Sequence, residues 1–338
     1  MDKKKLNKKG SVRQHFIPQF YLRNFGDVIY CYDKKNMIKF KTNPENIAVK
    51  SDFYGGEYEE FPSLEQEFSK IENSHSQAIK SLIEKKNYYS LNHMEKLGVC
   101  EFLGFQYLRG EQQRTHIKSM TDATLDTMFH KIIPKDLKVA LSEDNIIAFQ
   151  LNTIKDFRKF AVFFFNMRFI VFENHTSIPF WSSDNPLAKQ NEYDKHPFGT
   201  LGVLNRGIEI HVPITPTLSI IACDPTVFEH EPETKDLCVK QTVIRENFLQ
   251  LRSSSRFVYS NTDRFHIIKS MLSNNPHYRK DQGKFEYFKK KTGKNQMLIS
   301  AERNDRWDTS DGELMGELDI WMTQKEIEKI QNDKDLEL

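Results

Sequence analysis

The order of apolar and polar residues first predicts a β-hairpin near the amino terminus. Two apolar runs, Val28 to Tyr32 and Met37 to Phe40, flank a polar stretch from Asp33 to Asn36. Short apolar runs joined by a polar turn are typical of paired antiparallel strands. We therefore expect the chain to fold back on itself between residues 28 and 40.

A long amphipathic helix is predicted next. Ser63 and Gln66 have the three-residue spacing of a capping box, in which the two residues satisfy each other's backbone amides. The apolar residues that follow share one helical face: Leu64, Phe68, Ile71, Ala78 and Leu82. The pattern predicts a helix from about Leu64 to Lys85, and we expect its apolar face to be buried.

More helices should follow in the same part of the chain. Asn92 and Glu95 repeat the capping spacing and predict a helix from His93 to about Arg109. A third helix should continue as far as Pro134, because proline lacks the backbone donor that a helix interior needs. A further helical stretch should lead into the second half of the chain.

The pattern changes to short β-rich runs after about residue 165. These runs are Arg168–Phe172, Ile178–Ser182, Ile208–Val212, Leu218–Ala222 and Phe257–Ser260. Before the last run, apolar residues recur at a helical spacing and place one helix against the sheet: Leu237, Ile244, Phe248 and Leu251. The sequence predicts an α+β protein, with a helical amino-terminal half that carries a hairpin, then a largely antiparallel sheet with a packed helix.

We interpret residues 12–265 as one domain, with a helical part over 60–165 and a sheet-rich part over 166–265. Apolar residues are abundant enough to form a full core, at 38% of the chain. The chain from about Asn274 contains few apolar anchors until Leu314 to Met322, and we expect residues 266–338 to be a variable carboxyl-terminal extension.

Charge is nearly balanced along the whole chain. The sequence has 49 basic and 47 acidic residues, which argues against a uniformly basic nucleic-acid coat. Basic residues are in excess only locally, over residues 3–13 and 279–294. Such segments either lie in solvent or contact phosphate groups.

Cysteine usage and hydropathy favour a cytoplasmic protein. The four cysteines lie far apart without a C-x-x-C pair, so neither a disulfide framework nor a zinc ribbon is supported. No apolar stretch follows the amino-terminal lysines as in a signal peptide, and the longest apolar run, Phe160 to Phe172, is too short and polar to span a membrane. The motifs of P-loop ATPases, dinucleotide-binding enzymes, zincins and α/β-hydrolases are also missing from the sequence.

The densest candidate chemistry lies in the segment from Arg13 to Phe25, where polar groups alternate with aromatic rings. His15, Gln19 and Arg23 are spaced by four residues, so a helical segment would present them along one side. A proton donor or acceptor beside a guanidinium suits an anion-processing site. A hydrogen-bonded core histidine and a surface arginine explain the same residues structurally.

Two further polar groups have the same double interpretation. Gln106, Arg109 and Gln113 form a stripe on a helix that is otherwise apolar, and this stripe could hold a phosphate or carboxylate. Asp184 follows a β run, where a carboxylate commonly binds metal or transfers a proton, but Asp184, Asn185 and the proline after them also form a typical turn. The nearby residues Glu192, Asp194 and His196 do not have the spacing of metal ligands.

The segment Gln14-His15-Phe16-Ile17-Pro18, continued to Phe25, resembles the opening signature of a bacterial family, domain of unknown function 4238. Less specific similarity extends to Gln106–Arg109, Ser183–Pro186, Pro213–Pro216 and Asn247 with Val258–Ser260, and so over residues 12–265. Members of this family have no settled reaction. The resemblance implies an association with antiphage defence, based on the genomic neighbourhood of the family.

The leading hypothesis is therefore a bacterial antiphage defence effector that hydrolyses nucleic acid or another phosphodiester. We assign catalytic roles to His15, Arg109 and Asp184, and substrate binding to Gln19, Arg23, Gln106, Asn185 and Asn247. Asp184 would orient His15 or a divalent metal, whose other ligands the sequence does not define. The alternatives are a non-enzymatic sensor or adaptor that binds a phage or host component, and a purely structural polar network. On the first hypothesis, His15, Arg23, Arg109 and Asp184 should converge on one partly open cleft.

Overall fold

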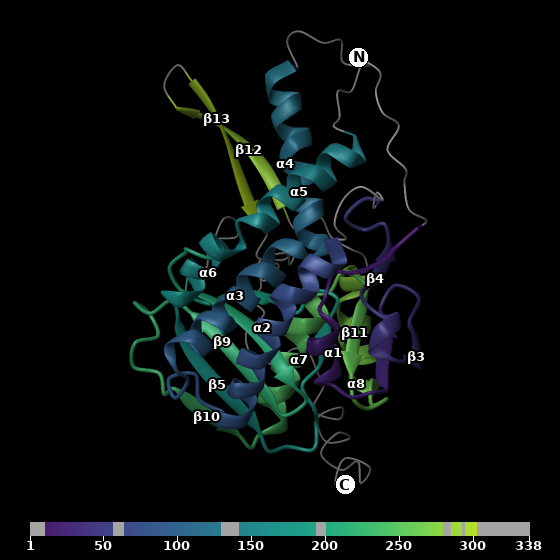
Figure 1. Cartoon of the computed structure of the whole chain (residues 1–338), viewed down its shortest axis with the longest axis vertical. Helices are drawn as coiled ribbons and strands as arrows, with labels where there is room; N and C mark the ends of the chain where they lie inside the picture. The colour runs from purple at the N-terminus through teal and green to yellow at the C-terminus, as the bar shows by residue number, and fades with distance from the viewer. Residues whose placement is uncertain are drawn as a thin grey trace.

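A computed structural model gives the fold (Figure 1). It describes residues 11–56, 64–129, 142–193, 201–279, 285–292 and 295–302. The protein is an α+β fold, with a group of helices from the first half of the chain and two larger sheets. None of the helices within these ranges combines the length and apolar character that a membrane span requires.

The amino-terminal part contains the predicted hairpin. Its strands are β2 (Ile29–Asp33) and β3 (Ile38–Thr42), which pair antiparallel from Ile29 opposite Thr42 to Asp33 opposite Ile38. The predicted hairpin is therefore confirmed. Around it lie four short elements: β1 (Arg13–His15), α1 (Gln19–Arg23), the 3₁₀ turn η1 (Pro44–Asn46) and β4 (Val49–Ser51). β1 pairs with β4 as a separate two-stranded sheet.

Five helices follow, and residues 64–129 are helical almost throughout, as predicted. They are α2 (Leu64–Lys85), α3 (His93–Arg109), α4 (Glu111–Phe129), α5 (Glu143–Lys155) and α6 (Phe157–Phe165). The capping box of α3 is present, with Asn92 accepting from the Glu95 amide at 2.9 Å and Glu95 accepting in return at 2.8 Å. Ser63 and the expected stop of α4 at Pro134 lie outside the described residues.

Glycine brings α3 and α6 close together. A Cβ atom at Gly104 would lie 2.8 Å from the Phe157 backbone oxygen and 2.9 Å from the Ala161 backbone nitrogen. These neighbours are backbone atoms that cannot rotate away, so only glycine fits at this crossing. The final predicted helical stretch consists of two helices, because the helix is interrupted at Asp156, which ends α5 and precedes α6.

The main sheet has five strands in the order β10-β5-β9-β8-β7. Its strands are β5 (Arg168–Asn174), β7 (Ala188–Asn191), β8 (Ile208–Thr215), β9 (Leu218–Cys223) and β10 (Thr234–Leu237). All pairs are antiparallel except β10 with β5, which is parallel. The predicted, largely antiparallel sheet is therefore confirmed, with one parallel edge.

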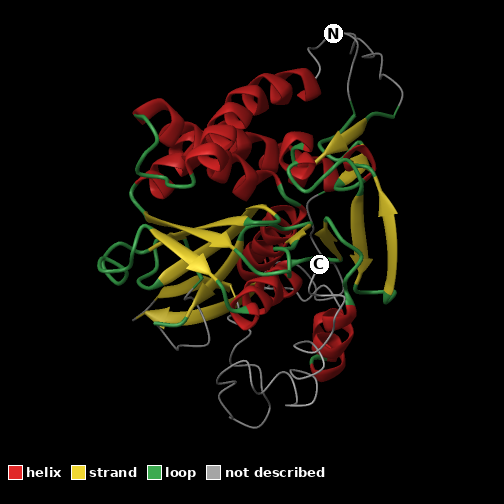
Figure 2. Ribbon diagram, turned by 90° about the horizontal axis from the view of Figure 1, so that it is seen from below, coloured by secondary structure: helices red, strands yellow, loops and turns green. Residues whose placement is uncertain are grey.

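Both faces of this sheet are covered, which explains its continuous apolar strands. On β5, Phe169 and Val171 join the core shared with the helices of the first half, whereas Ile170 and Phe172 join a second core on the other face. The second core is formed with α7 (Lys240–Ser253) and α8 (His266–Asn274). Figure 2 shows the helices gathered on one side of the sheet and α7 on the other.

The second sheet is antiparallel and has the order β3-β2-β11-β6. It adds β6 (Ser182–Ser183) and β11 (Phe257–Ser260) to the hairpin. Because α7 contacts strands of both sheets, it is the element that joins them. The described chain continues through the 3₁₀ turn η2 (Pro276–Arg279) to the paired strands β12 (Phe285–Thr292) and β13 (Asn295–Glu302).

Two predictions for the sheet-rich part are wrong in detail. The run Ile178–Ser182 is predicted as a strand, but only Ser182 and Ser183 are paired as β6. Pro179 cannot donate to a sheet, and the Asn247 side chain replaces a strand partner by accepting from the Trp181 amide at 2.7 Å and donating to the Pro179 carbonyl at 2.9 Å. Leu237 ends β10 instead of belonging to the helix, which begins three residues later.

The buried face of α2 gives a stability prediction. Phe68 is only 5% exposed, and its ring centroid lies 5.2 Å from that of Tyr54 and 5.1 Å from that of Phe105. Phe68→Ala removes these contacts and leaves a cavity, so it should lower the unfolding free energy by about 3–5 kcal/mol in chemical denaturation. Phe149→Ala, at a site that is 46% exposed, is the control and should change it far less. Equal losses would contradict the packing described for α2.

Candidate functional site

Arg109 is the centre of the first group of predicted site residues. Its side chain is 1% exposed at the end of α3. All three guanidinium nitrogens donate hydrogen bonds: Nε to the Tyr54 hydroxyl, and the other two to the Glu72 carboxylate and the His15 backbone carbonyl. The charge of Arg109 is thus neutralised by a carboxylate of α2, and its donors are directed at groups of the protein.

His15, Gln19 and Arg23 form a chain of side-chain contacts. Nδ1 of His15 lies 3.4 Å from Nε2 of Gln19, and Oε1 of Gln19 accepts from Arg23 at 3.1 Å. The four-residue spacing therefore brings the three together, although His15 ends a strand and only the other two belong to α1. Burial lowers the pKa of His15, and the charge of Arg109 lowers it further, which favours a neutral imidazole.

Three residues predicted to bind substrate form hydrogen bonds with other parts of the protein. Gln106 donates to the Phe16 carbonyl at 3.2 Å. Asn185 donates to the Ser253 hydroxyl at 2.8 Å and to the Ser253 carbonyl at 3.2 Å. Asn247 bonds the irregular segment before β6, as described above. Each of these amides therefore has partners within the protein.

Asp184 lies in a cradle of backbone amides at the start of β11. Its carboxylate oxygens accept from the amides of Ser255, Arg256 and Phe257 at 2.7, 2.8 and 2.9 Å. Burial raises the pKa of Asp184, although the nearby Lys34 and the three amides oppose this shift. Among the described residues it has no hydrogen bond or ion pair with His15, so direct contact joins His15 to Arg109 but not to Asp184.

A cavity of about 460 Å³ is lined by Asp184 but by neither His15 nor Arg109. It lies between the hairpin, β4, the start of α4 and β11. Phe16 and Glu111, close neighbours of His15 and Arg109 in the chain, line it together with Asp184. Its other charged and aromatic lining residues are Lys35, Lys50, Arg256, Arg279, Phe40, Phe257 and Tyr259. We take this cavity as the candidate functional site, since its volume is within the usual range for small-ligand sites.

Two polar atoms in this wall have unused hydrogen-bonding capacity among the described residues. They are Nε of Arg279 and the hydroxyl of Tyr259, a residue only 1% exposed. The Ala48 backbone interacts with the Tyr259 oxygen, but no described group accepts the hydroxyl proton. A group in the cavity can serve as that acceptor. Ala48 in the same wall has φ of 50°, a left-handed conformation that a residue with a Cβ atom rarely adopts.

The structure also forms a buried histidine cluster that sequence analysis missed. Nδ1 of His211 on β8 lies 2.8 Å from a carboxylate oxygen of Glu246 on α7, and Nε2 lies 3.6 Å from Glu209. Burial alone would lower the pKa of His211, but the two carboxylates outweigh it and raise the pKa to about 9. Because 35 residues separate His211 from Glu246, no local spacing could reveal this cluster.

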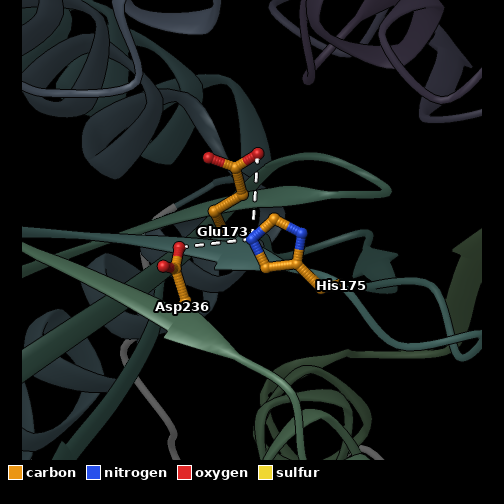
Figure 3. A group of neighbouring side chains, drawn as sticks. All are labelled: Glu173, His175 and Asp236. Carbon is orange, nitrogen blue, oxygen red and sulfur yellow. Dashed lines mark hydrogen bonds and ion pairs between the residues drawn. The ribbon is translucent and has the colours of Figure 1, made fainter.

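One described group combines residue types that could bind a metal ion: Glu173, His175 and Asp236 (Figure 3). It lies at the edge of the main sheet and shares no residue with the cavity. The sequence does not define the ligands of a metal. No local spacing reveals this group, because Asp236 is 61 residues from His175 in the chain.

Fold and cavity together describe an α+β protein with a partly open cavity, whose wall contains four basic and four aromatic side chains. A family model described as a protein of unknown function, DUF4238, matches residues 13–264. The chain belongs to this family, as the Gln14–Phe25 signature predicts. No curated protein and no solved structure matches the chain.

The contacts of Arg109 predict a large effect on stability. Arg109→Met leaves Glu72 without its partner in a partly buried position, so the unfolding free energy should fall by about 3–5 kcal/mol in chemical denaturation. Arg23→Met is the matched control, because Arg23 is 54% exposed and its pair with Glu45 at 3.7 Å should contribute at most about 1 kcal/mol. If the Arg109 variant is as stable as the wild type, the structural role of Arg109 is contradicted and a ligand-binding role is favoured instead.

The His211 cluster predicts a pH-dependent stability. A folded-state pKa of about 9, above the unfolded value near 6.5, favours the charged form on folding. The resulting stabilisation, about 3 kcal/mol, is fully present below about pH 6.5 and is lost as pH rises through 9. His211→Gln should therefore flatten the decline in unfolding free energy between pH 6.5 and 9.5, whereas the exposed control His93→Gln should not. An equally steep decline in both variants would contradict the charged cluster.

Proposed function

We propose that this protein is a binding protein of the sensor or adaptor class, which takes a small anionic ligand with a flat apolar part into the cavity. The buried hydroxyl of Tyr259, whose proton has no acceptor among the described residues, carries this proposal together with the basic and aromatic wall around it. The ligand would supply the acceptor that this hydroxyl lacks in the free protein.

The charge of the cavity wall favours an anion. Four of its six charged side chains are basic. Two of the bases are neutralised by acids, since Lys50 pairs with Glu111 and Arg256 pairs with Asp33 at 2.7 Å. Nε of Arg279 has no partner in the described part of the chain, so this guanidinium is the best-placed group for a phosphate or carboxylate.

The aromatic lining favours a flat group beside the anion. Phe40 and Phe257 meet edge to face with ring centroids 6.1 Å apart, and the Arg256 guanidinium lies 4.8 Å from the centroid of the Phe257 ring. Rings and guanidinium planes are the usual surfaces on which a planar ligand stacks. A nucleotide combines such a ring with phosphate, and it is the ligand class that fits both features.

Binding is better supported than hydrolysis. The donors of Arg109 are directed at protein groups, His15 does not line the cavity, and the carboxylate of Asp184 accepts hydrogen bonds from three backbone amides. A hydrolase remains the second candidate, because Asp184 lines the cavity in which a phosphodiester would lie. A divalent metal and a nucleic-acid substrate belong to that second candidate.

The biological setting that we propose is antiphage defence in the bacterial cytoplasm. It rests on the family resemblance alone. A plaque assay on cells expressing the wild type or a cavity variant tests it: protection that the variant loses supports the setting, and equal plaque counts with and without the protein refute it.

Tyr259→Phe tests the binding function, because it removes only the hydroxyl group. The free protein should keep its stability to within about 0.5 kcal/mol. Affinity for AMP, measured by calorimetric titration, should fall about 3- to 10-fold with the loss of one hydrogen bond. Tyr193→Phe, at a residue 51% exposed, is the matched control, and adenosine is the neutral counterpart of the probe. Equal AMP affinity in both variants, or no binding by the wild type, contradicts the proposal. Cleavage of RNA or DNA in the presence of Mg²⁺ or Mn²⁺ would instead favour the hydrolase.

A further inference from the structure

The edge of the main sheet brings two carboxylates side by side. β10 pairs with β5 in parallel, and in this register Asp236 is the partner of Glu173. Partner residues point to the same face of a sheet, so the two acidic side chains lie next to each other. His175 follows one residue after β5, and its amide donates to the Leu237 carbonyl at 3.0 Å. This bond continues the parallel pairing and brings the imidazole to the same place.

The imidazole lies between the two carboxylates, as Figure 3 shows. Its Nε2 is 3.2 Å from Oδ1 of Asp236 and 3.9 Å from Oε1 of Glu173. All three potential ligand atoms lie within 4.8 Å of one another. Zinc bonds of about 2.0–2.2 Å in a tetrahedral arrangement separate two ligand atoms by about 3.4 Å. Nε2 of His175 and Oδ1 of Asp236 are already near this spacing, whereas the Glu173 oxygen has to approach them.

Adjacent like charges on one face of a sheet repel each other and need a cation between them. Two cations of the protein are close: Lys86, which forms an ion pair with Oε1 of Glu173, and His175 when it is protonated. A divalent metal ion would neutralise both carboxylates at once and leave the imidazole neutral, which is the form that binds metals.

A polar cavity adjoins this group and gives a bound ion access to further ligands. It has a volume of about 910 Å³, and His175 forms part of its wall. The hydroxyl oxygens of Ser177 and Thr262 in the same wall are buried and have no hydrogen-bond partner among the described residues. Their hydrogen-bonding capacity is unused within the described residues and is available to water or another ligand in the cavity.

We propose that Glu173, His175 and Asp236 bind a first-row divalent metal ion of the zinc type. One imidazole and two carboxylates are a usual ligand set for such ions, and three protein ligands leave at least one position open to the solvent or to a ligand. The site is independent of the cavity proposed to bind an anion, with which it shares no residue.

Calorimetric titration of the metal-stripped full chain with Zn²⁺ tests this proposal. The wild type should bind one ion per chain at this site, and Asp236→Asn and His175→Gln should each weaken binding at least about tenfold. Asp263→Asn is the control, because Asp263 is a similarly exposed carboxylate that pairs with Lys39. Circular dichroism of each variant checks that the fold is kept, which the exposure of the ligands favours.

Lys86→Met provides an independent test of the geometry. Lys86 and the metal compete for Oε1 of Glu173, so the loss of the lysine should tighten Zn²⁺ binding. Zinc affinity that is the same in the wild type and both ligand variants would overturn the proposal, as would the absence of binding by the wild type. Unchanged or weaker binding by Lys86→Met would overturn the shared-oxygen geometry on which the site rests.

Discussion

The buried charge of Arg109 is the constraint on which the arrangement of the helical part depends. A guanidinium that is 1% exposed stabilises a fold only when it is neutralised and its donors are satisfied. Glu72 on α2, the Tyr54 hydroxyl and the His15 carbonyl meet these needs, and they come from three separate parts of the chain. The register of α2, α3 and β1 is thereby set at one point. Phe16, the residue after His15, and Glu111, two residues after Arg109, line the cavity.

Elsewhere, polar side chains form hydrogen bonds with backbone groups that have no partner strand. β6 has only two residues, and the irregular backbone around it is satisfied by the amide of Asn247 and the carboxylate of Asp184. Gln14 has the same function near the amino terminus, where it accepts from the Tyr54 amide at 2.7 Å. Such residues are buried because the backbone needs them, whether or not a ligand is present. Burial of a polar residue is therefore weak support for catalysis in this fold.

Periodicity made the helices and the hairpin predictable, because one buried face imposes a repeat on the sequence. α2, α3 and the hairpin lie where the patterns of Leu64–Lys85, His93–Arg109 and residues 28–40 predict them. The parallel strand β10 was not predictable, since its pairing depends on residues more than sixty positions away. The candidate site was predicted only in part for the same reason. Histidine, arginine and aspartate at positions 15, 109 and 184 fit a catalytic role and a structural role equally well. Only their hydrogen-bond and ion-pair partners in the structure distinguish the two roles.

The family relationship therefore bears on the fold more directly than on the ligand. The signature from Gln14 to Phe25 consists largely of residues that pack in the core or bond to the backbone, and these are requirements of folding. The cavity groups with unused hydrogen-bonding capacity are separate from it: Tyr259 is near the end of the matched range, and Arg279 is beyond residue 264, where the match ends. A guanidinium outside the family's common region contributes to the cavity wall of this chain. On the proposal that the cavity binds an anion, ligand selectivity can thus differ from that of a relative with the same fold, because Arg279 lies outside the matched range.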